Sequence, residues 1–319
     1  MPDQLSKTTH LFLSKTCLRT LLILLLGISN FALAQTSERA TTKNAITFSV
    51  LVTGQSSGSL EAMVVSGGRW FTSRQLVHTA VLVKHPSGNL LWDTGIGKNI
   101  AEQMKGFSFL EKQLFKLEAL NPAADQLKQD GIEPASLRAI IPSHLHWDHA
   151  SGLKDFPGIP VWIAQTELKN ARLGKAPSFI QSQFDEGIDW VDLDMSDQSL
   201  YGFDRSHDVF GDGSVLLVDL SGHTSGQVGM LLTVDERRSY FFIGDTTWTI
   251  KGIDTQKGRP GFVNAVLSVD QDVDKNQQRI DQIYQLKKSF QEQGKALYVV
   301  PAHDEFVNLK LPIFPAFLE

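Results

Sequence analysis

The chain of 319 residues has almost no cysteine, since Cys17 is its only one. One cysteine cannot form a disulfide within the chain, and it cannot build a cysteine-based zinc cluster. The chain also lacks an excess of positive charge, because 30 Lys and Arg stand against 35 Asp and Glu. These absences exclude a disulfide scaffold and argue against nucleic acid as a partner bound through charge.

No apolar run is long enough to span a bilayer. The run from Leu21 to Ala34 is shorter than the roughly 20 apolar residues required, and Gly27 and Asn30 interrupt it. Basic side chains precede it, and it ends in the A-x-A sequence Ala32-Leu33-Ala34, which is typical of a secretory signal peptide. We therefore expect residues 1–34 to be cleaved, leaving a periplasmic or secreted protein with no membrane attachment.

Cleavage would remove Cys17 and leave an acidic chain without thiols. Such a protein needs a packed core or bound metal for stability, and a cysteine nucleophile is excluded. The polar, threonine-rich residues 35–45 are expected to form a flexible leader. Residues 46–319 show no repeat and no linker, which predicts a single domain.

Strands followed by helices occur twice along the chain, which indicates an α/β protein with layers around one continuous core. Residues 174–213 have weak periodicity and are expected to cover a surface or form a lid. The expected strands are 46–53, 80–84, 89–92, 137–141, 161–164, 214–220, 228–234, 240–243 and 296–300. The expected helices are 109–120, 122–129, a short one from 166, and 275–293.

Three of the nine histidines lie within six positions, directly after the expected strand 137–141. The motif consists of His144, His146, Asp148 and His149. Neutral imidazoles suit zinc and similar metals, and a carboxylate adds an anionic ligand. His144 and His146 can converge on one ion, while Asp148 and His149 can point to a second.

Further candidate ligands follow other expected strands. His223 lies in a glycine-flanked turn, Asp245 comes just after strand 240–243, and His303 comes after the last strand. Sites in open α/β sheets usually form where the strands end. The sequence therefore predicts that these side chains meet the histidine motif at one edge of a sheet.

The His144-x-His146-x-Asp148-His149 motif, with His223, Asp245 and His303 in order, resembles the metallo-β-lactamase superfamily of hydrolases. That resemblance implies a four-layer αβ/βα sandwich and a site for two zinc ions, with manganese, iron or cobalt as alternatives. One ion would take His144, His146 and His223. The other would take Asp148, His149 and His303, and Asp245 would bridge the two.

The resemblance also implies a mechanism. The two ions would lower the pKa of a bridging water, and the resulting hydroxide would attack a carbonyl or phosphoryl centre. Asp148 would be both a ligand and a proton shuttle, which makes it the candidate catalytic residue. We expect an exported hydrolase that cleaves a small-molecule ester, lactone or phosphoester.

Two departures bear on the substrate. The bridging Asp245 places the chain nearest the lactonases and methyl-parathion-hydrolase-like enzymes, because the true β-lactamases lack that aspartate. Lactonases, however, have a tyrosine three positions later, where this chain has Trp248. Tryptophan has no phenolic hydroxyl to offer a carbonyl oxygen. A true β-lactam hydrolase, a nuclease of the superfamily and a non-catalytic metal-binding protein stay open as alternatives, and so does a homodimer.

Several other residues have less specific interpretations. Asp93 is either a turn residue or a partner that orients a ligand histidine. His78, His85 and His207 match no position of the resemblance and are expected to be surface or packing residues. The aromatic candidates for a pocket rim, although each taken alone is more typical of the core, are Phe107, Phe109, Trp147 and Trp248.

Overall fold

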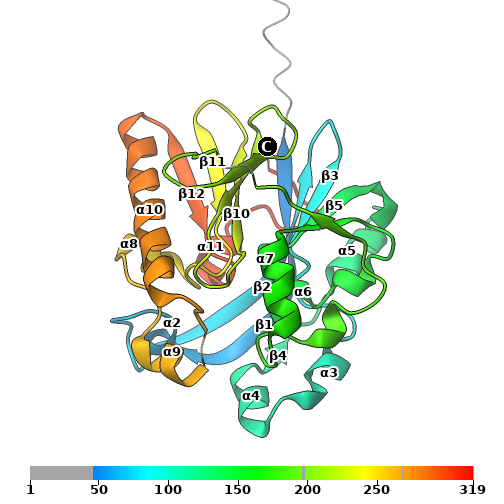
Figure 1. Cartoon of the computed structure of the whole chain (residues 1–319), viewed down its shortest axis with the longest axis vertical. Coiled ribbons are helices and arrows are strands. Elements are labelled where there is room, and N and C mark those ends of the chain that lie inside the picture. The colour runs from blue at the N-terminus through cyan, green and yellow to red at the C-terminus, as the bar shows by residue number, and fades with distance from the viewer. Residues whose placement is uncertain (1–45, 196–197, 268, 319) are drawn as a thin grey trace, which may run out of the picture. The chain divides into compact units, whose positions relative to one another are not determined.

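The computed structural model describes residues 46–195, 198–267 and 269–318. The expected signal peptide and leader, residues 1–45, lie outside this range. The described part contains two sheets (Figure 1). The seven-stranded sheet has the order β4 (Leu117–Glu118), β1 (Thr47–Leu60), β2 (Ser73–Lys84), β3 (Asn89–Trp92), β5 (Leu137–Ile141), β6 (Val161–Ile163) and β7 (Trp190–Asp192). The five-stranded sheet has the order β12 (Ala296–Val300), β11 (Arg238–Phe242), β10 (Val228–Thr233), β9 (Val215–Asp219) and β8 (Ser206–Asp208).

Helices connect and cover these strands. Figure 1 shows the long helix α10 along the five-stranded sheet and α5 to α7 beside the other sheet. The α-helices are α2 (Glu61–Val64), α3 (Ile100–Gln103), α4 (Phe109–Leu114), α5 (Ala123–Gln129), α6 (Trp147–Ala150), α7 (Gln165–Leu173), α8 (Ile250–Asp254), α9 (Gly261–Leu267), α10 (Val273–Glu292) and α11 (Glu305–Asn308). Among the described helices, none combines the length and apolarity needed to cross a membrane.

Three apolar clusters define four layers. One cluster fills the space between the sheets, with Phe48 and Val81 from one sheet against Met230 and Phe242 from the other. A second cluster packs α5 and α7 on the seven-stranded sheet, and a third packs α8 and α10 on the five-stranded sheet. The order of layers is therefore helix, sheet, sheet, helix, which confirms the expected αβ/βα sandwich.

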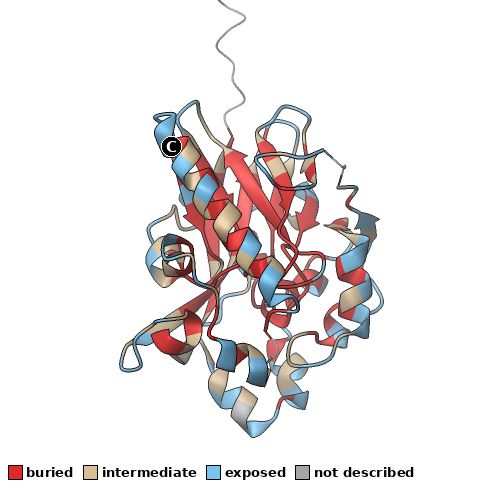
Figure 2. Cartoon of the chain, turned by 60° about the vertical axis from the view of Figure 1, so that its left-hand side comes forward, coloured by how far each residue is buried: buried red, intermediate tan, exposed pale blue. Residues whose placement is uncertain are grey.

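The inner strands are buried on both faces, as the buried colouring in Figure 2 shows. On β5, Ile140 packs toward the helices and Ile141 toward the other sheet. On β11, Phe241 packs against α10 and Phe242 packs between the sheets. Such strands read as continuous apolar runs in the sequence, because successive side chains enter different cores.

Several expected boundaries were wrong, because β1 continues to Leu60 and β2 begins at Ser73, and the short strands of region 174–213 were not expected. The helix expected over 109–120 ends at Leu114, because Leu117 pairs with Ser56 of β1 instead of continuing the helix. The region 174–213 contains β7 and β8, which form the outer strands of the two sheets. β7 and β8 are each only three residues long, and each is held by pairing with one strand, β6 and β9 respectively, so periodicity within three residues does not reveal them.

Candidate metal centre

Strand direction places three candidate ligands at one edge of the five-stranded sheet. β11 is parallel to β12, and β9 and β11 are both antiparallel to β10, so β9, β11 and β12 run in the same direction. The loops after their carboxyl ends carry His223, Asp245 and His303, respectively. All three side chains are buried.

The histidine motif enters from the other sheet. β5 ends at Ile141, and the chain turns into the single-turn helix α6, for which His146 is the N-cap residue. This turn directs Asp148 and His149 from the helix toward the same buried centre as the residues before it. The structure therefore brings together all seven side chains that the sequence indicated.

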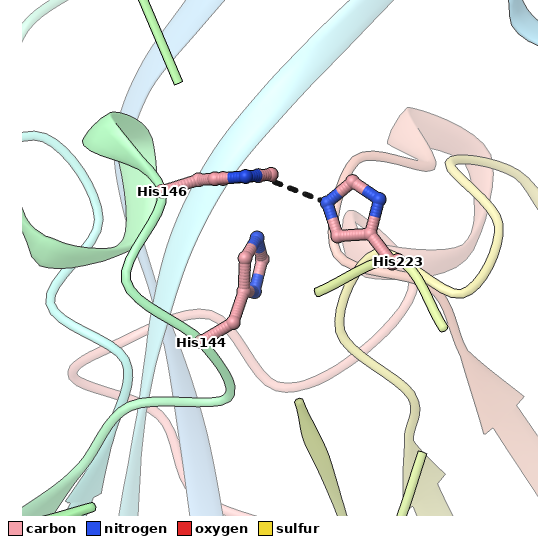
Figure 3. A group of neighbouring side chains, drawn as sticks. All are labelled: His144, His146 and His223. Carbon is pink, nitrogen blue, oxygen red and sulfur yellow. Dashed lines mark hydrogen bonds between the residues drawn. The ribbon is translucent and has the colours of Figure 1, made fainter. Parts of the chain in front are cut away.

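The first group within the centre consists of His144, His146 and His223 (Figure 3). The rings point toward one another, and His146 Nδ1 lies 2.9 Å from His223 Nε2. Burial lowers the pKa of His144 and His146 well below the ordinary value, and it also lowers the pKa of His223. Neutral imidazoles are the form that binds metal ions.

Asp245 lies between two sets of histidines. Its Oδ1 is 3.0 Å from His303 Nε2 and 3.3 Å from His149 Nε2, while its Oδ2 is 3.6 Å from His223 Nε2. Burial alone would raise the pKa of Asp245, but the charges of His303 and His149 hold it well below the ordinary value. An ionised carboxylate whose oxygens face different histidines has the geometry of a bridging ligand.

Asp148 is the second carboxylate of the centre and lies near His303 and His149. Its Oδ2 is 3.3 Å from His303 Nε2 and 3.9 Å from His149 Nε2. Burial opposes ionisation of Asp148, but His149 and the other neighbouring histidines lower its pKa. Burial would lower the pKa of His303, but the charge of Asp245 raises it above the ordinary value.

Carboxylates hold two of the histidines in place from outside the centre. Asp93 Oδ2 lies 2.9 Å from His149 Nδ1, and Asp270 Oδ1 lies 2.9 Å from His223 Nδ1. Arg259 donates to Asp270 Oδ1 at 2.6 Å. Such partners fix the tautomer of a histidine, so that its Nε2 is free for a ligand.

The donor atoms fit a metal ion. Within the described residues, His144 Nε2, His149 Nε2 and Asp245 Oδ1 are buried and have no hydrogen-bond partner. Leaving buried polar atoms unpaired is costly, and a cation at the centre would satisfy all three. A set of imidazole nitrogens and carboxylate oxygens suits zinc, and also manganese, iron or cobalt.

A family comparison agrees with this geometry. The sequence model of the family described as the metallo-beta-lactamase superfamily matches residues 74–303, which include every side chain of the centre. The chain belongs to the metallo-β-lactamase superfamily. It is therefore a hydrolase of that superfamily, as its sequence motif predicted.

Similar proteins include a curated N-acyl homoserine lactonase, AttM of Rhizobium radiobacter. It is 24% identical over 200 residues, which cover 61% of this chain and 73% of AttM. A solved N-acyl homoserine lactone hydrolase with N-hexanoyl-L-homoserine at its catalytic metal centre has a TM-score of 0.64 at 19% identity, and the match covers 85% of this chain and 98% of that one. The dizinc quorum-quenching lactonase AidC has a TM-score of 0.56 at 16% identity, with 85% and 89% covered.

An open pocket adjoins the centre of this superfamily member. His146, Asp148, Asp245 and His303 lie at its polar end. The rest of its wall is mainly apolar and includes Leu76, Leu114, Phe115, Trp147, Trp248, Leu267 and Val269. Such a space suits a substrate with an apolar substituent next to the bond that breaks.

The aromatic rim predicted from the sequence is half right. Trp147 and Trp248 line the cavity, whereas Phe107 is buried against Trp147 and Phe109 is 79% exposed. Phe115 lines the cavity instead. Phe109 is the first residue of α4, whose N-terminus is closed by the capping box of Ser108 and Glu111.

The structure places His78 at the centre, which the sequence did not predict. It was expected to be a surface or packing residue, but it is 3% exposed and its Nδ1 lies 3.1 Å from Asp148 Oδ2. With Asp148 and His303 it forms a second group of potential ligands. The strand that carries it begins at Ser73, earlier than expected, and pairing with β1 brings the side chain into the centre.

His85 and His207, the other two histidines expected to be surface or packing residues, do not belong to the centre. His85 stacks on Phe210 at 3.7 Å between ring centroids, which is a packing role, and its Nε2 lies 3.0 Å from Asp212 Oδ2. His207 is half-buried on β8. The expectation for these two residues is confirmed.

Ser56 also adjoins the centre and was missed. Its Oγ lies 2.7 Å from His78 Nε2, and it lines the cavity. The sequence Gly54-Gln55-Ser56-Ser57-Gly58 matches the letters of a G-x-S-x-G nucleophile elbow. That elbow requires a strand-to-helix turn, whereas Ser56 lies inside strand β1.

Proposed function

We propose that this chain is a dinuclear, zinc-dependent lactonase whose substrates carry an apolar acyl substituent. One observation carries the proposal: an ionised carboxylate–histidine centre forms the polar end of a pocket whose remaining wall is largely apolar. The lactone ring would meet the polar end, and the acyl chain would lie along Phe115, Leu267 and Val269. The similarity to curated homoserine lactonases supports a lactone over other esters.

We assign the seven candidate ligands to two zinc positions. His144, His146 and His223 would hold one ion, and Asp148, His149 and His303 the other, with Asp245 between them. Bound divalent ions would polarise the substrate carbonyl and lower the pKa of the attacking water. Side chains of the protein would move the proton and keep bulk water away from the substrate.

Asp148 is proposed as the residue that moves the proton. Its carboxylate lies at the polar end of the cavity and is nearly buried. As water adds to the carbonyl carbon, Asp148 would take the proton that the water loses. It would return that proton to the ring oxygen when the C–O bond of the lactone breaks, giving an acid and an alcohol.

Trp147, Phe115 and Trp248 exclude bulk water from the reacting end of the cavity. Trp147 packs between Phe107 and Phe115, with centroid distances of 5.9 and 5.5 Å. Trp248 is held by the guanidinium of Arg259, which lies 4.6 Å from the ring centroid. A dry pocket strengthens the interaction of charged groups with the substrate.

The test is a hydrolysis panel with the zinc-reconstituted protein. We expect hydrolysis of N-acyl homoserine lactones, faster with a decanoyl than with a butanoyl substituent, and much slower hydrolysis of a phosphotriester or a β-lactam. The Asp245→Ala variant is the matched control for contaminating activity. Turnover of the phosphotriester or the β-lactam in preference to every lactone would contradict the proposed substrate class.

We also propose that the protein is exported. Residues 1–34, which lie outside the described range, have the charge and apolar pattern of a signal peptide. Expression of the full chain in a Gram-negative host should give a periplasmic product whose N-terminus begins near Gln35. A cytoplasmic product that retains Met1 would refute this.

A further inference from the structure

The imidazole of His78 lies between a hydroxyl group and the metal centre. On one side, Nε2 is 2.7 Å from Ser56 Oγ. On the other side, Nδ1 is 3.1 Å from Asp148 Oδ2, yet it is buried and makes no hydrogen bond of acceptable geometry. His144 Nε2 and His149 Nε2, both expected metal-binding atoms, are unpaired in the same way.

The backbone around His78 is fixed by its neighbours. Thr53 Oγ1 donates to the carbonyl oxygen of His78 at 2.9 Å, at an irregularity in the β1–β2 pairing. The preceding carbonyl, Val77 O, lies 2.8 Å from His303 Nδ1. The same two residues of β2 therefore place the His78 ring and orient His303 so that its Nε2 points to the centre.

The contact with Ser56 has a consequence for the tautomer. The Ser56 hydroxyl can either donate to Nε2 or accept from it. Because Nδ1 makes no hydrogen bond of acceptable geometry to Asp148, we assign the proton to Nε2, which donates to Ser56 Oγ and leaves a lone pair on Nδ1 toward the Asp148 carboxylate. Two electron-rich atoms 3.1 Å apart repel each other unless a cation lies near both. His303 Nε2, at 3.3 Å from the same carboxylate oxygen, completes a set of three donors around one position.

We propose that His78, through Nδ1, is an additional ligand of the ion that Asp148 and His303 bind. This inference rests on the proposed metal-dependent function and extends its ligand set from seven residues to eight. The ion near β2 would then have one more nitrogen donor than the superfamily motif provides. It should bind more tightly than the same position without His78, and Ser56 would maintain the required tautomer.

The experiment measures zinc binding directly in the full chain. The metal-free protein is titrated with zinc against a chromophoric chelator, and a parallel sample is loaded with cobalt for its visible spectrum. In His78→Gln we expect one of two zinc affinities to fall by about 100-fold while the other is unchanged, together with a shift of the cobalt bands. His207→Gln is the matched control, since His207 lies on β8, away from the centre. We expect it to behave as the wild type.

Ser56→Ala provides a second variant that keeps the imidazole. We expect a smaller loss, about 10-fold, in the same zinc affinity, because only the tautomer is no longer fixed. Wild-type affinities and cobalt bands in His78→Gln would overturn the proposal. So would a Ser56→Ala variant that loses hydrolysis but binds both metals normally, because Ser56 would then be a nucleophile paired with His78. These affinity measurements do not need a substrate, so failure of the lactonase proposal would be seen separately in the hydrolysis panel.

Discussion

The indole nitrogen of Trp248 donates a hydrogen bond to Asp245 Oδ2 at 2.6 Å. Trp248 occupies the position where the lactonases that the chain resembles have a tyrosine. Its polar atom contacts the central carboxylate, and the guanidinium of Arg259 covers its ring. Trp248 therefore orients Asp245 in addition to forming a wall of the cavity.

Replacing Trp248 with phenylalanine should weaken zinc binding. Hydrogen bonds to charged groups contribute about 1.5–3 kcal/mol, which corresponds to a loss of about 10- to 100-fold in affinity when the orientation of Asp245 is no longer fixed. Chelator competition measures this effect. Trp190→Phe, on the edge strand β7, should have no effect, and equal affinities in both variants would show that the Trp248 contact is not needed.

Replacing Asp93 with asparagine tests the support of His149. Asp93 has a positive φ of 54° and accepts hydrogen bonds from Ser143 N at 2.6 Å and Ser143 Oγ at 3.0 Å, as well as contacting His149 Nδ1. We expect about 10- to 100-fold weaker zinc binding in Asp93→Asn. The exposed Asp130→Asn serves as control, and a wild-type affinity in Asp93→Asn would leave Asp93 as a turn residue only.

Removing the metal should destabilise the fold. The centre buries unpaired donor atoms on His144, His149 and Asp245 that a cation would satisfy. With zinc at about a thousandfold excess over its dissociation constant, mass action adds about 4 kcal/mol, or an increase of about 10 °C in melting temperature for a chain of this size. Calorimetry with and without a chelator measures this, and Asp245→Ala should largely lose the zinc-dependent increase.

The sequence predicted the seven candidate ligands because each of them lies in a short motif or directly after an expected strand. His144 to His149 form one short motif, and His223, Asp245 and His303 each come just after an apolar strand. Short spacing and strand ends are local features, so they can be recognised without knowing how the strands pair.

The parts that were missed depend on contacts between distant residues. His78 reaches the centre because β1 pairs with β2 and an irregularity occurs between Val52 and Gly54. Asp270 contacts His223 across 47 positions of the chain, from a loop with no motif of its own. Neither the register of the strands nor the path of that loop is encoded in a local pattern.

Glu61 should make the stability of the fold depend on acidic pH. Its side chain is 2% exposed and contacts Arg74 at 2.5 Å and Lys251 at 3.0 Å, so it joins α2 to β2 and α8. Burial would raise the pKa of Glu61, but hydrogen bonds from Arg69, Lys251 and Arg74 together lower it from 4.5 to about 2.

Because the pKa is lower in the folded state, the charge of Glu61 stabilises the fold fully above pH 4.5. That contribution decreases as the pH falls and is lost near pH 2. Urea unfolding should therefore show Glu61→Gln to be less stable than the wild type at neutral pH, with the difference shrinking through this window. The exposed Glu133→Gln should show no such trend. A difference between Glu61→Gln and the wild type that stays constant with pH would mean that shape, and not charge, accounts for the role of Glu61.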